Sequence, residues 1–145
     1  MNAPLIYKRR PQWGDTDAAQ IVYTGRIADY VLEAIDHFMR EVLKMPWFEL
    51  NIDEHIGTPF VSVKYDIFAP LTPRSELDCK VLVSKVGQTS VGFHVTIRND
   101  DGLKCVEAKT VNVFVDNQSM TKIDIPDKYR DLLESYVKAC GEIDD

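Results

Sequence analysis

The stretch YTGRIADYVLEAIDHFMREVLK, residues 23–44, decides the fold of this chain. Its apolar side chains recur at three- and four-residue spacing, which aligns them along one face of a helix. They are Ile27, Tyr30, Val31, Ala34, Ile35, Phe38 and Val42, and the opposite face carries Asp29, Glu33, Asp36, Arg40 and Glu41. Pro46 stops the pattern. A helix with a single apolar face needs a sheet to cover it.

The flanking sequence supplies that sheet. Residues 4–12 predict a first strand, and from residue 58 the hydrophobic period changes to two. Further strands are predicted from 58 to the break at Pro70, over 77–84, over 91–97 and over about 103–116. The turn Asn99-Asp100-Asp101-Gly102 is a strong hairpin signal, and strands joined by tight turns pair antiparallel. We therefore expect an α+β fold in which one curved, five-stranded antiparallel sheet wraps around the long helix.

Two further segments complete the predicted fold. Residues 46–57 form a connecting segment, and a C-terminal helix follows over about 127–139. The chain has neither an internal repeat nor a second region of different composition, so we expect residues 1–145 to form a single domain. An open sheet leaves long edge strands, which are a liability unless they are paired. We therefore expect a homodimer that pairs edge to edge and assembles further into a tetramer.

The composition narrows the classes of function. A net charge of −6 argues against binding to nucleic acid and to an anionic membrane surface. The N-terminus lacks the apolar stretch of a signal peptide, and no run is long and apolar enough to span a membrane. Cys79, Cys105 and Cys140 show no CxxC spacing, which favours free thiols in a reducing compartment. We therefore expect a cytoplasmic protein.

The chemistry is concentrated in the turn just before the long helix. Asp15 and Asp17 lie two residues apart in the segment WGDTDAAQIVY, residues 13–23. The first turn of a helix presents unpaired backbone N–H groups, which form an anion site. A carboxylate beside that site can serve as a base or a nucleophile. The alternative is that it only shapes the turn or caps the helix.

These residues resemble a known family. The motif Gly14-Asp15-Thr16-Asp17-Ala18-Ala19-Gln20-Ile21-Val22-Tyr23, the segment Met45-Pro46-Trp47 and the segment Gly57-Thr58-Pro59-Phe60-Val61-Ser62 are similar to those of hot-dog fold acyl-coenzyme A thioesterases. Within this fold they resemble the 4-hydroxybenzoyl-CoA thioesterase-like group. The resemblance covers nearly the whole chain and implies the hot-dog fold, an acyl-CoA substrate and no cofactor or metal.

The resemblance also implies roles for individual residues. Asp17 matches the family's catalytic carboxylate, which attacks the thioester carbonyl or activates a water to do so. The backbone N–H of Thr24, at the start of the helix, matches the donor that holds the oxyanion. Asp15 is expected to shape the loop instead. Both the covalent and the general-base route stay open.

Four residues are expected to contact the substrate: Tyr23 in the motif, Glu33 on the helix, Trp47 after it, and Thr58 near the place where the family's partner subunit closes the site. The family usually continues with a Pro-Asn-Tyr-like segment after the motif, whereas this chain has Thr24-Gly25-Arg26. The acyl group is therefore open. Candidates for binding the CoA phosphates are Lys64, Arg74, Lys85 and Arg98.

Two alternatives stay open beside the thioesterase. A hot-dog dehydratase or hydratase would place a histidine with a carboxylate in its site, and no histidine accompanies the Asp15–Asp17 turn. A non-catalytic module that binds acyl thioesters is the other alternative. His37, His55 and His94 show no ligand spacing typical of a metal site, so no metal is expected.

Overall fold

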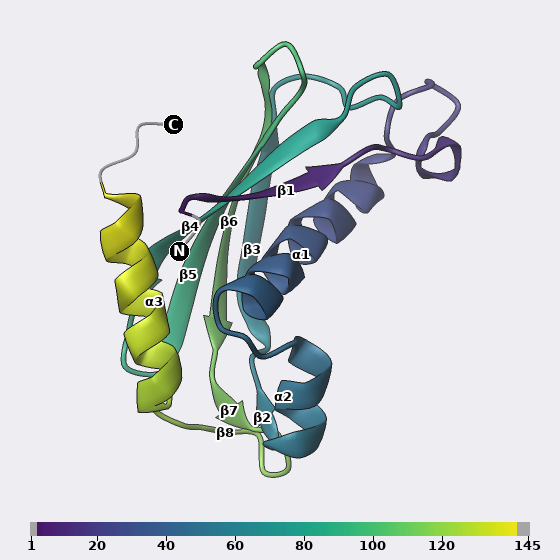
Figure 1. Ribbon diagram of the computed structural model, residues 1–145. Coiled ribbons are helices and arrows are strands. Elements are labelled where there is room, and N and C mark those ends of the chain that lie inside the picture. Colours follow the sequence, from purple (N-terminus) through teal and green to yellow (C-terminus); the bar gives the residue numbers. More distant parts are fainter. Residues whose placement is uncertain (1–2, 142–145) are drawn as a thin grey trace.

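The computed structural model describes residues 3–141 of the chain. Its main sheet contains β1 (Leu5–Arg9), β3 (Phe60–Ile67), β4 (Leu77–Val86), β5 (Ser90–Arg98) and β6 (Lys104–Val113). These strands lie in the order β1-β4-β5-β6-β3, and every neighbouring pair is antiparallel (Figure 1). The helix α1 (Thr24–Glu41) crosses one face of this sheet. The predicted curved sheet around one long helix is confirmed.

The segment between α1 and β3 is more structured than the sequence pattern predicted. It contains a helix, α2 (Trp47–Asp53), where only a connection was expected. Pro46 is the residue that caps α2, and proline is common at the first positions of a helix. Pro46 therefore separates two helices, and reading it only as the stop of α1 hid the second one.

A small second sheet was also not predicted. It contains β2 (Ile56–Gly57), β7 (Val115–Asp116) and β8 (Thr121–Lys122) in the order β2-β7-β8. The predicted last strand is therefore split, because Val115 and Asp116 leave the main sheet to pair with β2. The C-terminal helix α3 (Asp127–Cys140) agrees with its prediction to within one residue.

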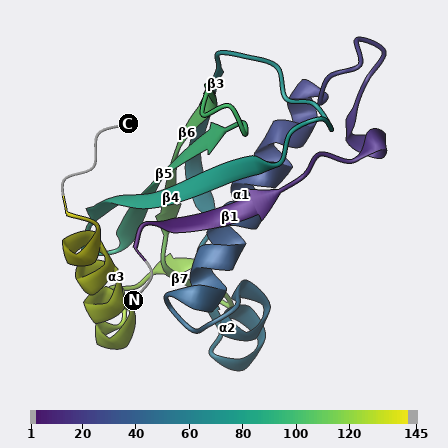
Figure 2. The same cartoon turned by 45° about the horizontal axis from the view of Figure 1, so that its top comes forward.

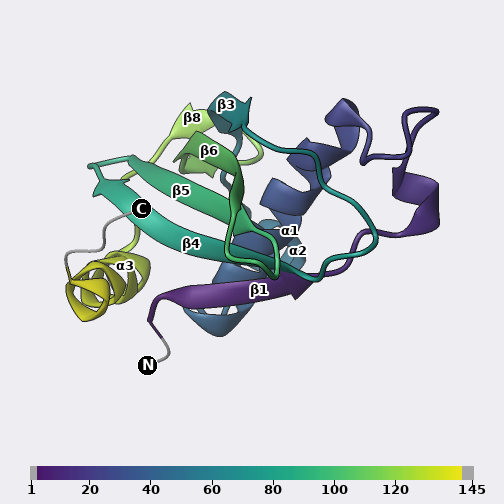
Figure 3. The ribbon, with the colours of Figure 1, turned by 90° about the horizontal axis from the view of Figure 1, so that it is seen from above.

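The core lies between α1 and the sheet. Phe38 of α1 is fully buried, and its ring packs edge-on against Phe93 of β5 at 5.2 Å and against Tyr136 of α3 at 4.8 Å. The Tyr136 hydroxyl accepts a hydrogen bond from the Leu5 N–H and donates one to the Val81 carbonyl, which ties α3 to β1 and β4. Viewed from above, α3 lies beside the sheet, next to β4 (Figure 3).

The three cysteines are free thiols, as predicted. Cys79 and Cys105 are buried in the sheet, and Cys140 is half-buried at the end of α3. Within residues 3–141, no helix is long and apolar enough to cross a membrane.

The edge strand β3 exposes apolar side chains. The exposed fraction is 63% for Val61, 49% for Val63 and 45% for Ile67. Val63 and Ile67 lie opposite Thr110 and Val106, which are buried on the α1 side of the sheet. The apolar inner face of the sheet therefore continues onto β3, beyond the area that α1 covers.

Candidate active site

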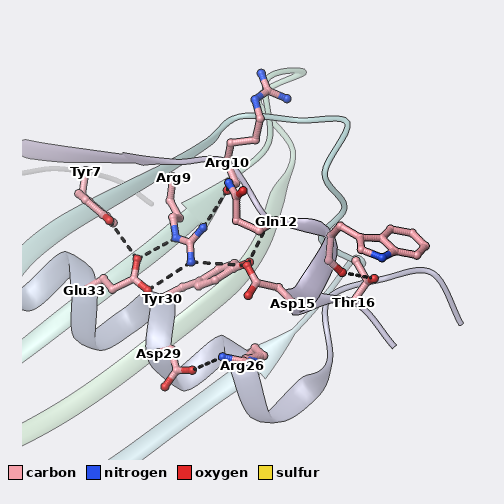
Figure 4. A network of polar contacts seen from close by, with 11 residues as sticks. Tyr7, Arg9, Arg10, Gln12, Asp15, Thr16, Arg26, Asp29, Tyr30 and Glu33 are labelled. Carbon is pink, nitrogen blue, oxygen red and sulfur yellow. Dashed lines mark hydrogen bonds and ion pairs between the residues drawn. The ribbon is translucent and has the colours of Figure 1, made fainter. Parts of the chain in front are cut away.

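The loop before α1 is anchored by a buried carboxylate (Figure 4). Asp15 is buried, and its Oδ2 accepts hydrogen bonds from the Tyr30 hydroxyl at 2.6 Å and from the Gln12 N–H at 3.0 Å. The carbonyl of Asp15 accepts the Tyr23 N–H at 2.9 Å. One residue thus ties the start of the loop to its end and to the second turn of α1. The expectation that Asp15 builds the loop agrees with these contacts.

Arg9 links this anchor to Glu33. Its Nη2 lies 3.5 Å from Asp15 Oδ2, and its Nε donates to Glu33 Oε1 at 2.8 Å. The guanidinium also lies over the Tyr30 ring, 4.6 Å from its centroid. The Tyr7 hydroxyl donates a second hydrogen bond to Glu33, at 2.9 Å. Two carboxylates are therefore held on either side of one arginine, which balances part of their charge.

The environment shifts the pKa values of this network. Burial raises the pKa of Asp15, but the hydrogen bonds from Tyr30 and Gln12 and the charge of Arg9 outweigh it, and the pKa is lowered from 3.8. Burial and the hydrogen bond to Glu33 raise the pKa of Tyr7 to about 12. Burial and the bond to Asp15 raise the pKa of Tyr30 as well. At neutral pH, Asp15 is ionised and both hydroxyls are protonated donors.

Asp17 lies at the exposed tip of the same loop. Its Oδ1 accepts the Ala19 N–H at 2.9 Å, and its own N–H donates to the Ile21 carbonyl at 3.0 Å. A backbone bridge between Thr16 and Val22 closes the loop behind it. The side chain is thus held in a turn, and the carboxylate remains accessible to a ligand.

The start of α1 is open beside this loop. Thr24 is the first residue of the helix, so its N–H has no partner within the helix. No side chain caps this end. The Tyr23 ring is 57% exposed and lies over Gly25, where a Cβ atom would approach the ring to 2.7 Å. A side chain at position 25 would therefore have to displace the exposed Tyr23 ring.

The other two predicted residues, Trp47 and Thr58, lie at the opposite end of α1. They line a cavity of about 310 Å³ between α2, β2 and β7. Its remaining lining is formed by Asn51, Gly57, Pro59, Phe60, Val115, Asn117 and Met120. The Trp47 ring packs edge-on against Phe60 at 5.9 Å. Among the residues that the structure describes, no lysine, arginine, aspartate or glutamate lines this cavity, which suits an apolar group.

The predicted site residues therefore form two groups within one chain. Asp17 and Tyr23 belong to the loop before α1 and Thr24 is its first residue, whereas Trp47 and Thr58 line the cavity beyond its end, where α2 follows α1 (Figure 2). The 18 residues of α1 alone separate the two ends by about 27 Å at 1.5 Å per residue. A groove of about 370 Å³ follows α1 between them. Its lining includes Arg9, Asp15, Arg26, Asp29, Tyr30, Glu33, Asp36 and Trp47.

Two residues of this region were not singled out from the sequence. Arg9 fell within the first predicted strand, residues 4–12, without a role of its own, and Tyr30 was counted only as part of the apolar face. A tyrosine in an apolar stripe carries a hydroxyl that needs a partner when buried, and this was the available signal. The sequence offered no comparable signal for Arg9.

The four candidates for phosphate binding do not come together. Lys64 lies on β3, Lys85 on β4 and Arg98 on β5, and Arg74 lies in the loop before β4. Lys64 lies 3.8 Å from Asp66, and Arg98 donates to the Gly102 carbonyl at 3.1 Å. In the described part of the chain, no group of three or more His, Cys, Asp or Glu side chains could hold a metal ion.

The chain is similar in sequence and structure to known thioesterases. Residues 11–133 match the model of the thioesterase-like superfamily. A crystal structure of a thioesterase superfamily protein from Jannaschia sp. CCS1 is 33% identical, with a TM-score of 0.88 over 94% of this chain and 95% of that one. A gentisyl-coenzyme A thioesterase is 27% identical, with a TM-score of 0.78 over 87% of this chain and 99% of that one.

Among proteins compared by sequence, the 1,4-dihydroxy-2-naphthoyl-CoA hydrolase of Nostoc punctiforme is 23% identical over 133 residues. The match spans 90% of this chain and 87% of that protein. These likenesses agree with the hot-dog fold expected from the sequence, because the relatives share the sheet and helix described above. By its family match and its fold, the chain belongs to the thioesterase-like superfamily.

Proposed function

We propose that this protein hydrolyses the thioester bond of an acyl- or aroyl-CoA to the free acid and CoA. The observation that carries the proposal is the exposed Asp17 carboxylate on a loop clamped beside the open start of α1. Two relatives support the substrate class, since one is named for hydrolysis of 1,4-dihydroxy-2-naphthoyl-CoA and the other for gentisyl-coenzyme A.

In this proposal, the Thr24 N–H and the Asp17 carboxylate have separate roles in the reaction. The thioester carbonyl lies with its oxygen toward the Thr24 N–H, which stabilises the negative charge that develops there. Asp17 then either takes a proton from an attacking water or attacks the carbonyl itself. In the second case, the thiolate of CoA leaves, and water hydrolyses the resulting anhydride. Both routes end with the same free acid and thiol.

The acyl group is assigned to the cavity of a second copy of the chain. The free edge of β3 and its exposed Val61, Val63 and Ile67 favour pairing with another β3. Antiparallel pairing of two β3 strands would bring the end of one beside the start of the other. We propose that this dimer is the first step towards a tetramer.

The two ends of β3 lie beside the two groups of predicted site residues. The Tyr65 hydroxyl donates to the Thr24 carbonyl at 3.1 Å, so the end of β3 lies beside the start of α1. Phe60, at the other end of β3, lines the cavity with Thr58. In the paired dimer, the cavity of one copy would therefore face Asp17 of the other. Each dimer would contain two such sites.

The remaining predicted contacts follow from this arrangement. Tyr23 would pack on the substrate near the reacting carbonyl, and Trp47 and Thr58 would line the acyl group. Glu33, held by Tyr7 and Arg9, would contact the substrate along the groove of α1. We propose that the whole chain works as one domain in the cytoplasm, where its three free thiols would stay reduced.

The direct test is the release of free thiol from a panel of aliphatic and aromatic acyl-CoA esters. We expect turnover well above the uncatalysed rate with at least one member. Binding of a thioester without turnover would instead indicate a binding module. Formation or hydration of a double bond without thiol release would indicate a dehydratase or hydratase.

A further inference from the structure

A second, smaller recess lies behind the cavity that Trp47 and Thr58 line. These two residues border both spaces, so the recess adjoins the inner end of the cavity. Its other lining residues are Met39, Leu43, Val91, Phe93, Asn112, Phe114 and Leu133. Its volume is about 10 Å³, which is enough for one water-sized group and too small for a ring.

Asn112 is the one amide side chain among the residues that line this recess. It lies on β6, is only 1% exposed and faces the core between Val91 and Phe60 of the neighbouring strands. Its Nδ2 donates to the Thr58 carbonyl at 2.7 Å. That contact fixes the amide, because the opposite orientation would place two oxygens against each other. Oδ1 therefore points away from Thr58.

This Oδ1 has no hydrogen-bond partner among the residues that the structure describes. A fully buried carbonyl oxygen without a partner is unfavourable, and in most proteins such an atom is paired. Apart from Trp47 and Thr58, the other side chains of the recess are apolar, and neither of these two donates to Oδ1. A donor must therefore come from a ligand or from a water.

We infer that Asn112 determines substrate specificity by accepting a hydrogen bond from a hydroxyl at the far end of the acyl group. This inference rests on the proposed function. The larger cavity of about 310 Å³ would hold the body of the acyl group, and the recess would hold its hydroxyl. An acyl group that ends in a methyl or hydrogen would leave Oδ1 unpaired, and such sites discriminate strongly against the analogue that lacks the hydroxyl.

The test compares substrates that differ only by this hydroxyl. The pairs are benzoyl-CoA with its 2-, 3- and 4-hydroxy derivatives, and hexanoyl-CoA with 6-hydroxyhexanoyl-CoA. We expect wild-type kcat/KM to be higher by about tenfold or more for at least one hydroxylated member. In Asn112→Leu, that ratio should fall towards one, mainly because the hydroxylated substrate becomes worse.

Thr110→Val is the matched control. Thr110 lies two residues away on the same strand and face, and its Oγ1 is also buried without a partner in the described chain. We expect this substitution to leave the ratio unchanged. A ratio that Thr110→Val lowers as much as Asn112→Leu would overturn the inference, because the effect would then come from general disturbance of β6.

Binding separates this inference from the proposed hydrolysis. Dissociation constants of non-hydrolysable thioether analogues of the same pairs are measured by calorimetry. If the hydroxyl preference appears in binding but no ester is turned over, the proposed hydrolysis fails and the role of Asn112 stands. If wild-type protein turns over both members of every pair equally, the role of Asn112 fails whether or not Asn112→Leu folds. If neither turnover nor binding occurs, both fail.

Discussion

The residues around the two ends of α1 differ in polarity. At its start, Asp15, Arg9 and Tyr30 form a charged and hydrogen-bonded network that holds a loop in place. Beyond its end, Trp47 and Phe60 border a cavity without charged lining. The first end can stabilise charge and move a proton, and the second can bind an apolar group. Thioester hydrolysis requires both, so under the proposed function each end would supply half of a site.

The separation of the two ends suggests a role for the edge strand β3 in the proposed dimer. Within one chain, the length of α1 keeps the halves apart by about 27 Å. Along β3, however, one half lies beside Phe60 and the other beside Tyr65. In the proposed dimer, an antiparallel pair of β3 strands would join the catalytic half of one copy to the binding half of another.

The largest expected effect is at the charged end. Asp17→Asn keeps the shape of the turn but removes the base or nucleophile, so we expect turnover to fall by about a hundredfold or more. The measurement is steady-state thiol release with the best ester of the panel. The control is the melting temperature, which should hardly change because Asp17 is exposed. Near-wild-type turnover would remove Asp17 from catalysis.

The next prediction joins the two ends by mixing subunits. Thr58→Trp fills the apolar cavity, and we expect it to be nearly inactive alone, like Asp17→Asn. The two variants are mixed in equal amounts, so about half of the dimers contain one subunit of each. If the site is shared between subunits, each mixed dimer has one intact site of two, and the mixture should regain about a quarter of wild-type activity. The measurement is thiol release after subunit exchange, with sedimentation to follow the dimer. Absence of recovery in demonstrably mixed dimers would place each site within one chain.

A smaller effect is expected from the anchor behind Asp17. Tyr30→Phe removes the hydroxyl that donates to Asp15 at 2.6 Å, and we expect a loss of about 1–3 kcal/mol in the free energy of unfolding. We also expect kcat to fall several-fold with KM little changed, because the loop that carries Asp17 loses a support. Denaturant unfolding and steady-state kinetics measure the two effects.

Tyr136→Phe is the matched control for this prediction. Tyr136 is equally buried, and its hydroxyl bonds to Leu5 and Val81 on the side of the sheet where α3 lies. We expect a similar loss of stability with kcat unchanged. Equal losses of kcat in both variants would show that Tyr30 acts only through the stability of the fold.

The same contrast explains what the sequence could predict. Periodicity depends on many residues at once, so the long helix and the five strands were foreseen, and the spacing of the cysteines indicated free thiols. The motif also pointed to the loop of Asp15 and Asp17. The partners of Asp15 could not be foreseen, since Arg9 and Tyr30 reach it only through the pairing of β1 and the rotation of α1. The helix α2 was missed because Pro46 was taken as an end and not also as a start.

The smallest expected effect is the response of the anchor to acid. Because the pKa of Asp15 is lowered from 3.8 in the folded protein, its ionised form stabilises the fold above pH 3.8. That contribution is lost as the pH falls through the lowered value. The effect is modest, because burial of the carboxylate opposes the hydrogen bonds that lower its pKa.

The test compares the unfolding free energies of wild type and Asp15→Asn between pH 7 and pH 3. The difference should be constant above about pH 5 and narrow below pH 3.8. A difference that widens in acid would mean that the folded protein favours protonated Asp15, and the charged end of α1 would then lack its ionic anchor.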